Sequence, residues 1–201
     1  MLAAPKESLL DLMNTSLSYT DTLDKIDCLK KTLRLDKRHI FFHNHHVSHA
    51  YAALTFNGFP KSEILILDGF GENASGLIAS FEKNQGLFIK KILPPSKSIG
   101  LFYSAITAFC GFKVLTGEYK LMGLASYGTP IYYEKLCDYF GNPNIKEFST
   151  KKLKFFGQKL YDKSLEKILG FEARCPGGQI NTCYKDLASS AQKFLEKFTL
   201  S

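Results

Sequence analysis

The 201-residue sequence contains no tryptophan, and no two of its cysteines have the CxxC spacing. The cysteines form an odd and scattered set: Cys28, Cys110, Cys137, Cys175 and Cys183. Small secreted proteins stabilised by disulfides have an even number of cysteines in a regular framework, which this set lacks. The sequence therefore favours reduced thiols and a cytoplasmic location.

Long apolar runs are also missing. The longest uncharged stretch, Ser98 to Phe112, is short for a membrane span and fits a buried helix. The N-terminal sequence has no charged segment before a long apolar run, so no signal peptide is predicted. We expect no association with a membrane.

The charge is moderately basic, with 26 Lys and Arg against 19 Asp and Glu. A nucleic acid or a phosphate-bearing substrate would explain this balance. The basic residues are scattered apart from one denser stretch, which is also typical of a solvated face. Its members are Lys146, Lys151, Lys152, Lys154 and Lys159. We expect no nucleic-acid partner.

All five histidines fall between His39 and His49. His45 and His49 are four residues apart, so on a helix they share one face and could hold one divalent metal ion. Asp68 follows the apolar run Ile64–Leu67, and its carboxylate is predicted at the C-terminal end of a buried strand. Two nitrogens and one oxygen form a facial ligand set with open positions, which suits iron or zinc. Ordinary hydrogen-bonded structural histidines are the alternative.

Two glycine-containing segments follow. The segment 68–73, DGFGEN, is either an ordinary turn or a phosphate cradle formed by backbone N–H groups. The segment 117–128, GEYKLMGLASYG, is either a connection with a surface lysine or a site where Lys120 neutralises a phosphate or a developing oxyanion.

Periodicity predicts an α/β fold in which a three-stranded antiparallel meander is packed by helices. We expect strands at 40–42, 64–67, 75–81 and 87–93, helices within 5–35 and at 45–56, 99–112, 131–140, 164–169 and 187–198, and a hairpin or loop at 145–156. Such a meander with a returning helix forms half of a ribonuclease-H-like unit, and two such units build the actin-like (ASKHA) fold. By this analogy the chain is a partial actin-like domain.

Four motifs in order, HHVSHA, LILDGFGE, SIGLFYSAITAFCGF and GEYKLMGLASYG, resemble the carbamoyltransferase family of nodulation and antibiotic-tailoring O-carbamoyltransferases. The resemblance is strong over residues 40–130 and weaker through 186–192. It implies an actin-like domain that binds carbamoyl-adenylate and transfers its carbamoyl group to a hydroxyl of a sugar or natural-product acceptor. A second domain of the family makes the adenylate from carbamoyl phosphate and ATP.

The resemblance also implies roles for single residues. A metal ion, iron(II) or another divalent ion, is expected on His45, His49 and Asp68. Gly69, Gly71, Glu72 and Glu118 are assigned to the nucleotide site. His46, which lies about 100° around the helix from His45, and Lys120 are the candidate catalytic residues.

The chain is several hundred residues shorter than the family pattern, so we expect a fragment of the domain. Its parts are a helical region with the histidines (1–60), the meander with nucleotide loops (61–130) and a mostly helical insertion with a C-terminal helix (131–201). A complementary polypeptide could supply the missing parts. Two alternatives remain. One is a catalytically silent metal- or nucleotide-binding fragment or interaction module, and the other is carbamoyl or threonylcarbamoyl transfer in hydrogenase maturation or tRNA modification.

Overall fold

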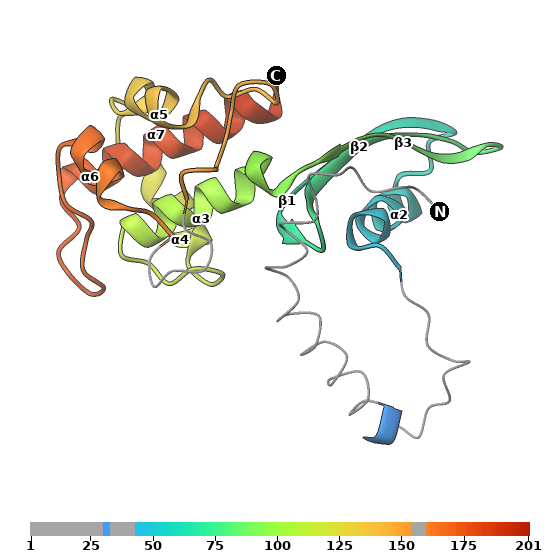
Figure 1. Ribbon diagram of the computed structural model, residues 1–201, viewed down its shortest axis with the longest axis horizontal. Helices are drawn as coiled ribbons and strands as arrows, with labels where there is room; N and C mark the ends of the chain where they lie inside the picture. Colours follow the sequence, from blue (N-terminus) through green and yellow to red (C-terminus); the bar gives the residue numbers. More distant parts are fainter. Residues whose placement is uncertain (1–29, 33–42, 154–159) are drawn as a thin grey trace. The chain divides into compact units, whose positions relative to one another are not determined.

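A computed structural model describes residues 30–32, 43–153 and 160–201 (Figure 1). The chain divides into two compact units, Met1–Phe59 and Pro60–Ser201, and each is described by itself. Residues 30–32 are helical. The rest of the helical region predicted within 5–35 lies outside the described residues. The strand predicted at 40–42 does so too.

The histidine motif of the first unit forms helix α2, His45–Asn57. The helix begins at Asn44, whose side-chain Oδ1 accepts a hydrogen bond from the backbone N–H of Val47 at 3.0 Å. It ends at Gly58, which has a left-handed backbone with φ of 66°. The prediction of a helix over 45–56 is confirmed.

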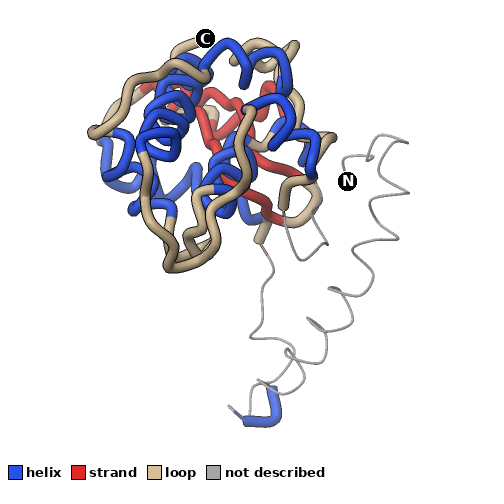
Figure 2. The backbone as a smooth tube through the Cα atoms, turned by 90° about the vertical axis from the view of Figure 1, so that its left-hand side faces the viewer, coloured by secondary structure: helices blue, strands red, loops and turns tan. Residues whose placement is uncertain are grey.

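The second unit begins with three antiparallel strands in the order β1-β2-β3, drawn in red in Figure 2. The strands are β1 Lys61–Gly71, β2 Ala74–Glu82 and β3 Gly86–Leu93. The predicted meander is therefore confirmed. The tight turn expected over 68–73 is wrong in extent, because β1 continues to Gly71 and leaves only Glu72 and Asn73 as the turn.

The end of β1 carries a bulge. Leu67 pairs with Gly76, and the next pair joins Gly71 to Ala74. Three residues of β1, from Asp68 to Phe70, therefore lie opposite the single residue Ser75 of β2. The extra residues allow the strand to bend and change the direction of a side chain there.

In the described residues after the sheet, the chain forms five helices and a short 3-10 turn. They are η2 Pro95–Lys97, α3 Ile99–Phe109, α4 Glu118–Ala125, α5 Tyr133–Phe140, α6 Lys163–Leu169 and α7 Thr182–Thr199. The helices predicted near 131–140, 164–169 and 187–198 are confirmed. The helix predicted over 99–112 ends earlier, before Gly111 with φ of 70°. The segment 117–128 contains helix α4. The sequence pattern predicts no helix there, only a connection or a binding site at Lys120.

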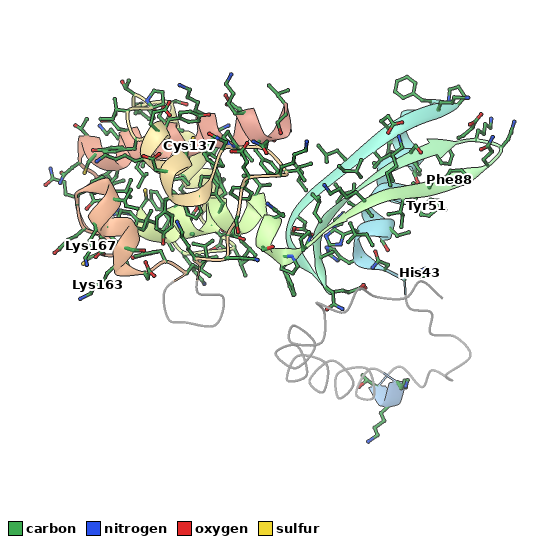
Figure 3. All side chains as sticks on the ribbon, turned by 45° about the horizontal axis from the view of Figure 1, so that its top comes forward. His43, Tyr51, Phe88, Cys137, Lys163 and Lys167 are labelled. Atoms are coloured by element: carbon green, nitrogen blue, oxygen red, sulfur yellow. The ribbon has the colours of Figure 1, made fainter. Side chains whose placement is uncertain are left out.

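Helix α6 illustrates how the helices of the second unit pack. On α6, Leu165 and Leu169 are buried, whereas Lys163 and Lys167, one turn apart, are exposed (Figure 3).

The described part of the predicted hairpin or loop, residues 145–153, has turns but no strand. None of the described helices is long and apolar enough to cross a membrane.

Phenylalanine side chains dominate the core among α3, α5 and α7. Phe102 stacks on Phe194 with ring centroids 4.6 Å apart and meets Phe140 edge-on at 5.0 Å. Phe148, from the loop after α5, contacts the Phe194 ring at 5.6 Å. These four side chains are at most 2% exposed, so the core joins elements that are far apart in the sequence.

Replacement of Phe194 by alanine is expected to destabilise the protein by about 3–5 kcal/mol, because it removes a fully buried ring and leaves a cavity. Urea unfolding followed by circular dichroism measures the loss. Tyr127→Ala is the matched control, since Tyr127 is 77% exposed, and it should change stability by less than about 0.5 kcal/mol. Equal losses in both variants would contradict the described core.

Candidate metal-binding and nucleotide-binding residues

His45 and His49 turn their rings toward each other on one face of α2. The two Nε2 atoms are 3.1 Å apart, and the ring centroids are separated by 4.6 Å. This juxtaposition follows from the four-residue spacing and from the helix start fixed by Asn44. The prediction that both imidazoles share one face is confirmed.

The separation of the two nitrogens matches what one metal ion requires. With metal–nitrogen bonds of about 2.1 Å, two nitrogens 3.1 Å apart subtend an angle of about 95° at the ion. This value is near the right angle of an octahedral site and below the wider angle of a tetrahedral one. The same pair can share a proton as a hydrogen bond, with either ring as donor according to its tautomer. The separation of the two nitrogens therefore matches two neighbouring positions of a six-coordinate divalent ion.

His46 follows His45 and lies on the adjacent face of the helix. Its ring packs edge-on against that of His45, with centroids 5.0 Å apart. It does not share the Nε2 contact that joins His45 to His49. Its proposed role at the reacting atoms stays a prediction.

Asp68 occupies the first position of the bulge in β1. Its Oδ1 accepts a hydrogen bond from the backbone N–H of Gly69 at 2.6 Å. Ser98 holds the backbone of the same bulge, because its hydroxyl lies 3.0 Å from the Asp68 carbonyl oxygen and 2.5 Å from that of Gly69. Asp68 belongs to the second unit, and its place in the same metal site as the histidines stays a prediction.

The other residues of the predicted phosphate cradle form the rest of the bulge and its turn. Gly71 is buried and pairs with Ala74. Glu72 is exposed and has a left-handed backbone with φ of 56°. The structure therefore places Gly69, Gly71 and Glu72 on one short, sharply bent segment next to Asp68, and nucleotide binding by them stays a prediction.

Glu118, at the start of α4, is held by three hydrogen bonds. Its carboxylate accepts from the Ser104 hydroxyl at 2.8 Å, from the Leu115 N–H at 2.9 Å and from the Gly117 N–H at 3.2 Å. Desolvation raises the pKa of this group, but the hydrogen bonds together outweigh it and the pKa is lowered from 4.5. The carboxylate thereby ties α3 to the loop in which Leu115 has a φ of 68°. This anchoring role is what the structure shows for Glu118.

Lys120 lies on the exposed side of α4. Its Nζ is 5.8 Å from the centroid of the Tyr119 ring, a neighbour that is also exposed. Leu121 and Ala125 face the core instead. The helix thus presents the lysine to solvent, and its role toward a phosphate or oxyanion stays a prediction.

Sequence reasoning missed two residues that shape these sites. Asn44 fixes the first turn of α2, and Ser98 connects α3 to the bulge. Both are residue types that favour helix N-caps, and each immediately precedes its helix, so the capping preference was an available signal.

A sequence model described as "Carbamoyltransferase N-terminus" matches residues 8–201. The chain belongs to the carbamoyltransferase family. The four motifs that suggested this resemblance lie on α2, β1, α3 and α4.

The chain is also similar to three curated proteins. The chain is 34% identical over 178 residues to the uncharacterised protein sll1178 of Synechocystis, covering 87% of this chain and 28% of the relative. It is 34% identical over 167 residues to nodulation protein NolNO of Sinorhizobium fredii, covering 81% and 23%. Nodulation protein NolO of Bradyrhizobium diazoefficiens is 38% identical over 99 residues, covering 48% and 17%. The chain thus spans about a quarter of the length of the first two.

Glu118→Gln is expected to reduce the dependence of stability on acid pH. Because the folded pKa is lowered, the unfolded state binds more protons below about 4.5, and the carboxylate's contribution is lost as pH falls through the folded pKa. Urea unfolding at pH 7 and at several values from 5 to 3 measures the effect. Ser104→Ala should shift stability in the same direction by a smaller amount.

The matched control is Glu134→Gln, which removes one negative charge from an exposed position on α5. This variant should show nearly the same dependence of the free energy of unfolding on pH as the unaltered chain. If Glu118→Gln and Glu134→Gln gave the same profile, the anchoring role of Glu118 would be refuted.

Proposed function

We propose that this chain contributes the carbamoyl-transferring part of an enzyme that moves a carbamoyl group from carbamoyl-adenylate to a hydroxyl group, with AMP as the leaving group. The acceptor is a sugar or natural product, and the adenylate is made from carbamoyl phosphate and ATP. Two observations support the proposal: the family match over residues 8–201, and the paired Nε2 atoms of His45 and His49. The histidine pair is the observation that supports the chemistry most directly, because it supplies two metal ligands that already lie side by side.

The residues that would hold the metal are His45 and His49, through Nε2, and Asp68, through its carboxylate. The two nitrogens fit the ion by their separation of 3.1 Å. Iron(II) is the proposed ion, and the mixed nitrogen and oxygen donor set is of the type that it uses with open positions. When bound, it supplies Lewis-acid polarisation of a carbonyl or phosphoryl oxygen.

The other residues bind and orient the reactants in this proposal. The meander and α3 are part of an actin-like domain, with Gly69, Gly71 and Glu72 at the nucleotide. Most of the rate enhancement comes from holding the acceptor hydroxyl near the carbamoyl carbon and from electrostatic stabilisation. Lys120 neutralises developing negative charge, and His46 is the first candidate for accepting the hydroxyl proton.

His49→Ala is expected to abolish tight binding of iron(II), because one imidazole is left without its partner four residues away. The metal content of the protein after anaerobic loading and gel filtration measures the loss, and His45→Ala should behave alike. His43→Ala is the matched control, since His43 precedes the helix and should leave the metal content unchanged. Stoichiometric iron retained by His49→Ala would contradict the site.

Carbamoyl transfer is tested by complementation. The chain is mixed with a polypeptide carrying the remaining part of the Sinorhizobium fredii relative, together with ATP, carbamoyl phosphate, iron(II) and a sugar acceptor. We expect a carbamoylated acceptor, detected by mass spectrometry, which is absent when the chain carries His49→Ala. A mixture that stays inactive while the intact relative is active would favour the silent binding module.

A further inference from the structure

The hydroxyl of Ser98 serves two elements at once. As the N-cap of α3 it accepts a hydrogen bond from the Leu101 N–H at 3.0 Å. As a donor it lies within reach of the carbonyl oxygens of Asp68, at 3.0 Å, and Gly69, at 2.5 Å. Ser98 is fully buried, so water does not compete for these contacts. The start of α3 is therefore tied to the bulge of β1 by one side chain.

Gly100 brings the same two elements into close contact. A Cβ atom at this position would lie 2.6 Å from the Gly69 nitrogen, 2.7 Å from the Gly69 Cα and 2.8 Å from the Asp68 carbonyl carbon. All three atoms belong to the backbone, so no side-chain movement could relieve the overlap. The absence of a side chain at Gly100 thus sets how closely α3 approaches the bulge.

The two contacts act on the residue that bears the candidate metal ligand. In a bulge the ladder no longer fixes the backbone, because Asp68, Gly69 and Phe70 face only Ser75. The Gly69 N–H contacts the Asp68 carboxylate, but the position of both residues depends on the backbone of the bulge. Ser98 and Gly100 constrain this backbone from α3, whose Phe102, Ile106 and Phe109 are fully buried in the core.

We infer that Ser98 and Gly100 are positioning residues that fix the bulge of β1 so that the Asp68 carboxylate is held ready for a divalent metal ion. The inference rests on the proposed function, since it takes Asp68 as a ligand. Ser98 and Gly100 belong to the motif SIGLFYSAITAFCGF. The inference gives these two residues a role near the metal ligand in addition to their role in packing α3. Groups that orient a metal ligand typically change affinity by about 10- to 100-fold when they are lost.

The test measures the dissociation constant of Co(II), a spectroscopic probe for the site, in the full chain. Ser98→Ala removes both the cap and the donor, and Ser98→Thr retains both. Ser98→Gly removes the donor but leaves a residue that is nearly as good at a helix N-cap. We expect about 10-fold or weaker binding and an altered Co(II) absorption spectrum for Ser98→Ala and Ser98→Gly, and near-normal values for Ser98→Thr.

Gly100→Ala is a second, independent variant and should weaken binding to a similar extent. Its matched control is Gly123→Ala, because Gly123 lies within α4 and an added Cβ there meets nothing within 4 Å. Asp162→Ala is the control for loss of a helix cap remote from the bulge, since Asp162 caps α6 by accepting from the Ser164 N–H at 2.8 Å. Urea unfolding of each variant verifies that it is folded under the titration conditions.

The outcomes separate this inference from the proposed function. Weaker binding in Ser98→Ala, Ser98→Gly and Gly100→Ala, with both controls near the unaltered value, supports the positioning role. Binding as tight as that of the unaltered chain in the folded Ser98 and Gly100 variants overturns it and leaves the metal site intact. If the unaltered chain does not bind Co(II), or His49→Ala binds it equally well, the metal site itself is contradicted, and this inference fails with it.

Discussion

The close contact between the first turn of α3 and the bulge of β1 is the constraint on which the second unit depends. No side chain fits between Gly100 and the backbone at Gly69, and the Ser98 hydroxyl contacts the carbonyl oxygens of Asp68 and Gly69. Because α3 also carries Phe102 into the phenylalanine core, the contact connects the sheet to the helices. Packing of α3 in the core therefore also stabilises the bulge of β1 that contains Asp68.

The start and end of α2 and its histidine pair depend on interactions that are local in the sequence. The amide side chain of Asn44 starts α2, Gly58 ends it, and the helical repeat alone brings the Nε2 atoms of His45 and His49 to 3.1 Å. No distant packing is needed to form this pair.

The sequence was informative where the determining interactions are short-range. The spacing of His45 and His49 and the periodicity of the meander predicted the observed elements closely. The bulge was not predicted, since the glycines of the segment 68–73 are equally typical of a turn, and only pairing with β2 decides between them. The helical state of α4 was also missed, because its glycines obscured the two buried positions Leu121 and Ala125.

The contacts of the polar residues were the least predictable. The carboxylate of Glu118 contacts Ser104, fourteen residues earlier, and the Ser98 hydroxyl contacts Asp68, thirty residues earlier. Neither pairing has a sequence pattern, because both arise from how α3 packs against other elements. Similarly, nothing in its neighbourhood in the sequence distinguishes Lys120 from an ordinary surface lysine.

The central claim is that His45 and His49 bind one divalent cation through their Nε2 atoms. Nitrogen-15 NMR of the histidine rings, recorded with and without Zn(II) as a diamagnetic probe, tests it most directly. We expect the Nε2 resonances of His45 and His49 to move together at one equivalent of zinc, with the ring proton on Nδ1 in both zinc-bound histidines and with His43 unchanged. Ligation through Nδ1, or two rings that fail to respond to the same equivalent, would contradict it.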